Sequence, residues 1–197
     1  MEIKTITVGS YQTNCYMAWG ASSNTCILID PGYEPEYILE QVRRQGKTVE
    51  AILLTHGHFD HVGGVKEIAA QTDCSVFICK EDLSLNPMLT DGAISYTDTY
   101  AEGDTLSLAG LQLQVLQTPG HTPGSVCLLC EDVLFAGDTL FAGTCGRTDL
   151  PGGSMTQMRR SLGRLAALEG NYQVLPGHGG ASLLDIERRS NPYMQRL

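Results

Sequence analysis

The chain has 197 residues, of which 42% are apolar, and it carries a formal net charge of −9 with a sequence pI of about 4.9. This length fits one domain, which we expect to span residues 1–197, and the apolar content is enough for a hydrophobic core. The acidic balance and the lack of a Lys/Arg run argue against a protein that binds nucleic acid.

The first half of the chain alternates apolar runs with turn residues and with two stretches of helical spacing. We predict helices at Glu36–Arg44, which Gly46 ends, and from Gly64 to Gln71. Residues 86–104 are irregular and polar, and we expect them to form a flexible lid beside the functional site. The predicted strands are Ile3–Val8, Asn14–Trp19, Cys26–Ile29, Ala51–Leu54 and Ser75–Cys79.

The second half repeats this pattern of strands with attached helices. An amphipathic helix is predicted at Met155–Leu168 and a last helix at Ser182–Ser190. Together the two halves predict an α+β fold in which two sheets pack face to face with helices outside. The predicted strands are Thr105–Leu108, Leu111–Thr118, Ser125–Cys130, Val133–Ala136 and Val174–Leu175.

All five histidines lie in three short motifs. The first motif, residues 55–61, reads Thr-His-Gly-His-Phe-Asp-His, and the others are Pro-Gly-His and Pro-Gly-His-Gly. An aspartate in Ala-Gly-Asp-Thr completes a set of candidate metal ligands, because imidazole and carboxylate suit zinc, iron and manganese. The set is His56, His58, Asp60, His61, His121, Asp138 and His178.

Each of these candidate ligands follows a predicted strand, and strand ends are rigid supports from which loops direct side chains to one point. One ion needs three or four protein ligands, and this chain offers more. The excess predicts two ions that share one carboxylate. The alternative, in which His56, His58 and His61 are hydrogen-bonded turn residues, does not account for so dense a cluster.

The string His-x-His-x-Asp-His, followed by a distant His, Asp and His, resembles the signature of the metallo-β-lactamase superfamily. The chain is most similar to the glyoxalase II-like (hydroxyacylglutathione hydrolase-like) branch, in its short bacterial form without a C-terminal helical domain. Supporting strings are Thr13–Tyr16, Asp30–Gly32, Gly146–Gly153 and Asn191–Tyr193. The resemblance implies a four-layer αβ/βα sandwich with two mixed β-sheets face to face and helices outside.

The resemblance also implies the ligand assignment, in which Asp138 bridges two ions. The first ion is held by His56, His58 and His121, and the second by Asp60, His61 and His178. The implied cofactors are two divalent cations, zinc first among them, with iron or manganese as alternatives. A hydroxide bridging them attacks a carbonyl carbon, and Asp60 is expected to handle a proton as well as bind metal.

The implied partner is a small-molecule thioester or ester, with S-D-lactoylglutathione the leading case. Cys145, Arg147 and Asp149 are the candidate substrate-binding residues. Family members contact glutathione through a Cys-Gly-Lys/Arg-x-Tyr stretch, and in this chain Asp149 replaces the tyrosine. Arg147 therefore has two open roles, pairing with a substrate carboxylate or with Asp149. Asp30 also has two, a partner for a ligand histidine or a turn residue before proline.

Two other functions remain open on the same scaffold. The Gly-Arg-Thr-Asp string also occurs in persulfide dioxygenases of the superfamily, which use one iron, and His56, His121 and Asp138 would then be its ligands. The second open function is that of a sensor, which binds metal or ligand without turnover, although a complete ligand set argues against it. Elemental analysis separates the enzymes, because hydrolysis requires two ions and oxidation requires one iron.

The cysteines bear on the expected compartment and on one further motif. They are odd in number and irregularly spaced, as is typical of reduced thiols, and the first residues lack the features of a signal peptide. No apolar stretch reaches the length that crosses a bilayer, so we expect a cytoplasmic protein. Cys127 and Cys130 form a Cys-x-x-Cys inside a predicted strand, where they point to opposite faces and are expected to pack in the core.

Overall fold

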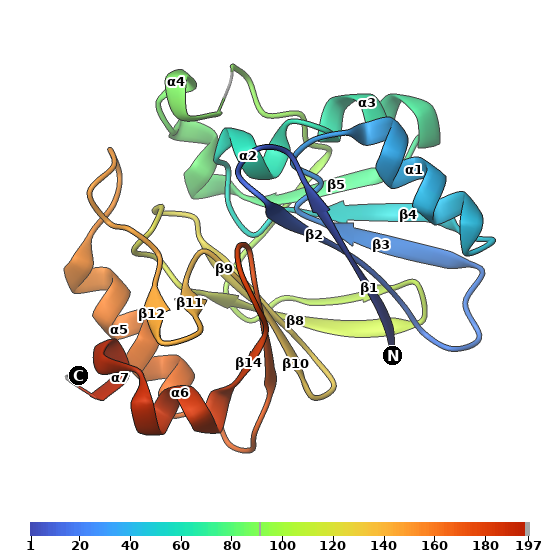
Figure 1. Ribbon diagram of the computed structural model, residues 1–197. Coiled ribbons are helices and arrows are strands. Elements are labelled where there is room, and N and C mark those ends of the chain that lie inside the picture. Colours follow the sequence, from blue (N-terminus) through green and yellow to red (C-terminus); the bar gives the residue numbers. More distant parts are fainter. Residues whose placement is uncertain (91, 196–197) are drawn as a thin grey trace.

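The computed structural model describes residues 1–90 and 92–195. Two six-stranded sheets face each other, and helices cover both outer sides (Figure 1). Both sheets are mixed, so the fold is the predicted four-layer αβ/βα sandwich. Within the described residues, no helix is both long enough and apolar enough to cross a membrane.

The first sheet has the strand order β1-β2-β3-β4-β5-β6. Its first three strands pair antiparallel and the rest parallel, with helices α1 (Pro35–Arg44) and α3 (Val65–Thr72) in the connections that follow β3 and β4. The strands are β1 (Glu2–Val8), β2 (Thr13–Trp19), β3 (Thr25–Ile29), β4 (Thr48–Leu53), β5 (Ser75–Cys79) and β6 (Asp98–Tyr100).

The second sheet has the order β14-β13-β10-β9-β8-β7, and only β10 and β13 pair in parallel. A hairpin of β11 (Leu140–Phe141) and β12 (Thr144–Cys145) stands beside it. The sheet strands are β7 (Thr105–Leu108), β8 (Leu111–Gln117), β9 (Val126–Cys130), β10 (Val133–Gly137), β13 (Gln173–Pro176) and β14 (Ser182–Leu183).

Three apolar layers follow from the alternation of side chains along the strands. On β3, Cys26 and Leu28 pack against α1 and α3, whereas Ile27 and Ile29 pack between the sheets. The outer face of the second sheet packs against α5 (Met155–Ala166) through residues such as Leu162. Helices α6 (Leu184–Ser190) and α7 (Pro192–Gln195) complete that layer.

Cys127 and Cys130 lie in different apolar layers, as their spacing predicted. Cys127 faces α5 and Cys130 faces the space between the sheets. All seven cysteines are free thiols. Burial raises the pKa of Cys127 and that of Cys130 to about 11. The Cys-x-x-Cys string is therefore part of the packing and not a paired redox site.

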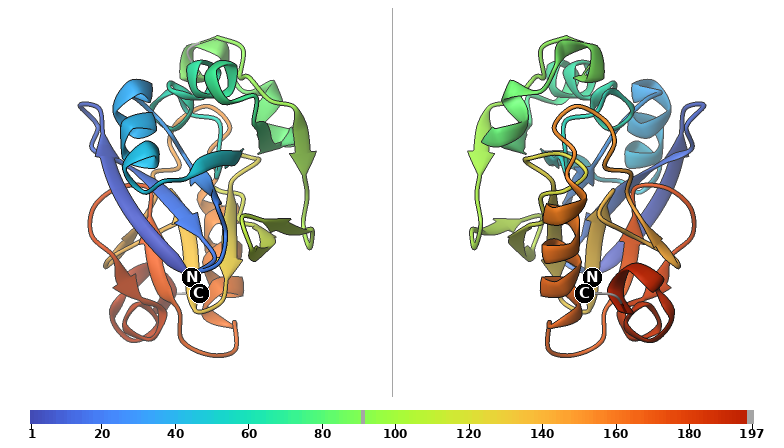
Figure 2. Two further views of the ribbon diagram at one scale, coloured as in Figure 1. Left: turned by 90° about the vertical axis from the view of Figure 1, so that its right-hand side faces the viewer. Right: turned by 90° about the vertical axis from the view of Figure 1, so that its left-hand side faces the viewer.

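Two predictions of secondary structure were incomplete, and two short helices of the first half were not predicted. The polar segment 86–104 is not irregular throughout, because it contains α4 (Pro87–Thr90) and β6; Asp91 within it lies outside the described residues. The 3₁₀ helix η1 (Lys80–Ser84) precedes it, and α2 (Phe59–Val62) lies inside the first histidine motif. The last helix begins at Leu184, because residues 182–183 pair with β13 as β14. Figure 2 shows α4 at the end of the molecule away from the N-terminus.

Candidate metal centre

The seven predicted ligands come together at one end of the sandwich. His56 and His58 lie in the loop after β4, and Asp60 and His61 lie on α2. The others follow strands of the second sheet: His121 after β8, Asp138 after β10 and His178 after β13. Because β10 and β13 run parallel, the residues after their carboxyl ends emerge at the same edge.

The first group of ligands is His56, His58 and His121, whose ligating atoms lie within 4.8 Å of one another. All three side chains are buried. His58 Nδ1 lies 2.8 Å from His121 Nε2, so the loops after β4 and β8 meet at these two rings.

The second group is Asp60, His61 and His178, which also lie within 4.8 Å of one another. His178 Nε2 is 3.2 Å from Asp60 Oδ2, and His61 Nε2 is 3.7 Å from the same oxygen. This group is more open, since 27% of the His178 side chain is exposed against 4% for His121.

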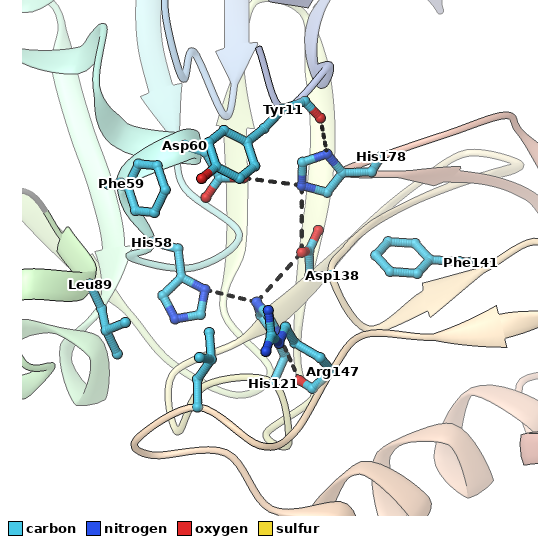
Figure 3. A pocket seen from close by; sticks show the side chains of 11 residues that line it. Tyr11, His58, Phe59, Asp60, Leu89, His121, Asp138, Phe141, Arg147 and His178 are labelled. Atoms are coloured by element: carbon cyan, nitrogen blue, oxygen red, sulfur yellow. Dashed lines mark hydrogen bonds and ion pairs between the residues drawn. The ribbon is translucent and has the colours of Figure 1, made fainter. Parts of the chain in front are cut away.

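Asp138 lies between the two groups (Figure 3). Its Oδ2 is 3.5 Å from His121 Nε2 and 3.6 Å from His178 Nε2, and its Oδ1 is 3.5 Å from His61 Nε2. One carboxylate therefore contacts residues of both groups, which is the position that a shared ligand needs.

Several ligand rings are oriented by a hydrogen bond at the nitrogen that faces away from the site. His121 Nδ1 donates to the carbonyl oxygen of Arg147 at 2.7 Å, and His178 Nδ1 donates to that of Tyr11 at 3.0 Å. A carbonyl only accepts, so in the neutral ring Nδ1 carries the proton and Nε2 presents its lone pair to the site.

Asp30 orients His61 in the same way. His61 Nδ1 donates to Asp30 Oδ2 at 2.9 Å, and the same carboxylate accepts from the backbone N and the hydroxyl of Thr55 at 2.7 and 2.6 Å. The predicted partnership with a ligand histidine is therefore observed. Asp30 also has φ of 52°, an uncommon backbone conformation for a residue other than glycine.

Electrostatics separate the two groups. Burial, followed by the neighbouring imidazoles, holds the pKa of His56 well below its ordinary value and lowers the pKa of His58 to about 3. In the second group burial opposes the charge on His61, but the carboxylates of Asp138 and Asp30 outweigh it and raise the pKa of His61 to about 9. His56 and His58 are therefore neutral donors, whereas the second group balances cationic imidazole against carboxylates.

Two buried atoms without hydrogen-bond partners indicate that this cluster is suited to binding metal. His56 Nε2 and Asp138 Oδ1 are buried and have no hydrogen-bond partner within residues 1–90 and 92–195. A buried nitrogen and a buried carboxylate oxygen are costly without a partner, and a divalent cation would satisfy both. Histidine and aspartate are also the donor set that zinc and iron accept. The cluster is a metal-binding site in its chemistry, and its geometry divides it into two groups.

The centre forms the floor of a cleft of about 560 Å³. The lining residues that sequence did not identify are mainly apolar: Phe59, Leu89, Phe141, Leu150 and Tyr11, the last of which was left unassigned. Tyr11 and Phe59 meet edge to face with ring centroids 5.3 Å apart (Figure 3). Phe59 was discoverable, since it lies inside the first histidine motif, and Phe141 follows Asp138 closely, whereas Tyr11 is far from the ligands in sequence.

The three candidate substrate residues are placed differently from one another. Arg147 lines the cleft, and its guanidinium pairs with both carboxylate oxygens of Asp149, at 2.8 and 2.9 Å. Both side chains are exposed. Cys145 is not among the residues that line the cleft; it is half-buried against the α5 layer, and burial raises the pKa of its thiol.

Comparisons with known proteins agree with this geometry. The model of the Metallo-beta-lactamase superfamily matches residues 8–178. The hydroxyacylglutathione hydrolase GloC of Haemophilus influenzae is 32% identical, covering 98% of this chain and 98% of that one. The probable metallo-hydrolase YqgX of Bacillus subtilis is 36% identical with the same coverage of both chains.

Solved structures show the same fold. BLEG-1, described as a B3 metallo-beta-lactamase, has a TM-score of 0.88 at 33% identity, covering 98% of this chain and 99% of that one. TTHA1623 in a di-iron-bound form has a TM-score of 0.85 at 37% identity, covering 96% and 99%. ETHE1 from Myxococcus xanthus has a TM-score of 0.85 at 28% identity, covering 98% and 84%.

Proposed function

The chain belongs to the metallo-β-lactamase superfamily, and on that premise we propose that it is a dinuclear metal-dependent hydrolase of a small thioester or ester. The observation that carries the proposal is Asp138, whose two oxygens lie between two complete groups of ligands on the floor of one cleft. His56, His58 and His121 would hold one ion and Asp60, His61 and His178 the other.

Two divalent cations supply a nucleophilic oxygen that is ionised near neutral pH, and they polarise the carbonyl of the substrate. The protein supplies the geometry, because Asp30 and the carbonyl of Tyr11 fix the rings of His61 and His178. Tyr11, Phe59 and Phe141 give the cleft aromatic walls beside the ligand groups.

Asp60 is a ligand of the second group. Burial works to raise its pKa, but the hydrogen bond with His178 and the charges of His61 and His178 outweigh burial and lower the pKa to about 2. At neutral pH Asp60 is therefore a carboxylate that can bind a cation, and so low a pKa makes it a weak base, which does not favour the proton handling expected from sequence. A thiolate leaving group needs little help from an acid, which favours a thioester over an amide.

The leading substrate is a hydroxyacylglutathione, supported by the similarity to GloC over the length of both chains. Zinc is our first choice of metal, and the di-iron form of TTHA1623 supports iron as an alternative. The test is elemental analysis of the purified protein together with hydrolysis of S-D-lactoylglutathione. We expect two ions per chain, and a kcat/KM below about 10² M⁻¹s⁻¹ would contradict this substrate.

A second candidate is oxidation of a persulfide at one iron, which the similarity to ETHE1 favours. In that case His56, His121 and Asp138 would hold the iron. Oxygen uptake with glutathione persulfide and one iron per chain would support this candidate. Two ions, thioester hydrolysis and no oxygen uptake would exclude it, and the absence of any turnover would support the sensor.

A further inference from the structure

Asp82 is a fully buried carboxylate on η1 that the proposed chemistry does not use. In the described part of the chain it forms no ion pair with Lys or Arg. A buried carboxylate is unfavourable unless its oxygens accept hydrogen bonds. Its partners therefore indicate what it does.

All of its partners belong to the two loops that carry the first group of ligands. Asp82 Oδ2 accepts from the backbone N of Gly57 at 2.8 Å, and Gly57 lies between His56 and His58. The same oxygen accepts from the hydroxyl of Thr122, which follows His121, at 2.8 Å. Oδ1 accepts from the backbone N of Gly124 at 2.6 Å.

Two glycines allow this close approach. A Cβ at Gly124 would lie 2.6 Å from Asp82 Oδ1 and 2.7 Å from the backbone N of Asp82. A Cβ at Gly57 would lie 2.7 Å from Ile94 Cδ1 and 3.2 Å from Leu85 Cδ1, both in the segment that follows η1. Both loops are thus packed against the η1 region with no space for a side chain.

We infer that Asp82 is a positioning residue, which joins the two loops of the first ligand group and holds His56, His58 and His121 at metal-binding distance from one another. The two loops are separated by more than 60 residues of chain, and their rings meet at the 2.8 Å contact of His58 with His121. A single carboxylate that accepts from both loops fixes their separation directly. The inference rests on the proposed function in one respect, namely that the first group binds an ion.

Glu187 offers a matched control. It is 1% exposed, and it also accepts three hydrogen bonds: from the backbone N of Gly143 at 2.8 Å, from Asn191 Nδ2 at 2.8 Å and from the hydroxyl of Ser182. None of these donors lies within two residues of a candidate ligand. Glu187→Gln therefore removes the same chemistry from a buried three-donor site away from the first group.

The experiment compares Asp82→Asn and Glu187→Gln as zinc-loaded proteins in competition with a chromophoric chelator. The amide of Asp82→Asn keeps one accepting oxygen and places an N–H₂ where the other oxygen accepted, so either the hydrogen bond from Gly124 or those from Gly57 and Thr122 are disrupted. We expect one of the two zinc ions to bind about 10- to 100-fold more weakly, the range for loss of a group that orients ligands. Glu187→Gln should keep both zinc affinities, although thermal unfolding with chelator should show both variants destabilised.

Gly124→Ala is the second variant, and it decides the matter if Asp82→Asn does not fold. This variant keeps the carboxylate of Asp82, but the added Cβ pushes that carboxylate away from the loop after β8. The same ion should therefore bind more weakly. Unchanged zinc affinities in both variants, or an equal loss of zinc in Glu187→Gln, would overturn the inference. If the parent protein itself binds no zinc, iron or manganese, the proposed function fails. If the parent binds metal and the variants behave like it, only the inference about Asp82 fails.

Discussion

The two ligand groups occupy one cleft but differ in burial and charge. His56, His58 and His121 are buried among one another, and the low pKa of His58 keeps its ring neutral. His61 and His178 face carboxylates, which raise the pKa of both. The comparison teaches that His56 and His58 accept a cation without losing protons, whereas His61 and His178 exchange protons for it. We therefore expect the first group to fill before the second.

The largest effect is expected from Asp138→Ala, because this residue contacts both groups. Removing a shared ligand should lower metal content and turnover together. Turnover should fall by more than the roughly 10- to 100-fold that is typical for loss of a group that only orients a ligand. Elemental analysis and a thioester assay measure the two quantities. Asp149→Ala, an exposed aspartate, is the control and should keep both ions. Near-parental activity of Asp138→Ala would contradict the shared site.

The comparison is sharpened by removing one histidine from each group. His178→Ala should leave one ion per chain, because the first group keeps its buried ligands. His121→Ala should instead lose the more tightly held ion and lower zinc affinity by at least about 100-fold. Zinc titration of the two variants gives the order of filling. If both retain the same single affinity, the two groups are not separate sites.

The pH dependence of zinc binding should differ between the groups. Burial opposes the charge on His61, yet nearby carboxylates raise the pKa of this group to about 9 in the metal-free protein. A cation must displace that proton, so affinity at the second group falls as pH falls below this value, by about tenfold per unit. The low pKa values of His56 and His58 predict that these two ligands of the first group release no proton over the same range. Titrations near pH 8 and pH 6 measure this, and equal slopes would refute the comparison.

The smallest effect is expected at the rim of the cleft. Asp149→Asn removes the partner that occupies the guanidinium of Arg147. Because the pair is exposed, releasing Arg147 should lower KM for S-D-lactoylglutathione by only about two- to fivefold and leave kcat unchanged. A thioester without a carboxylate serves as the control substrate. An equal change in KM for both substrates would show that Arg147 does not recognise the carboxylate of the substrate.

The sequence was sufficient for the sandwich and for identifying the histidines and aspartates that cluster in one cleft, because both depend on strong local signals. Alternating apolar strands define the layers, and the dense motif around His58 identifies the centre. It did not predict α2 or β6, since elements of three or four residues depend on tertiary contacts more than on their own propensity. It placed residues 86–104 beside the site, where Leu89 of this segment does line the cleft, but it did not assign Tyr11, because no local pattern specifies which distant loops meet.

The last ligand depends on the first hairpin of the chain. Asn14 donates through Nδ2 to the carbonyls of Pro176 and Gly179, and the hydroxyl of Tyr16 donates to Pro176 at 2.6 Å. His178 itself is bridged to Thr13. During synthesis on a ribosome, Asn14 and Tyr16 therefore lack these hydrogen-bond partners until a segment about 160 residues later in the chain has emerged.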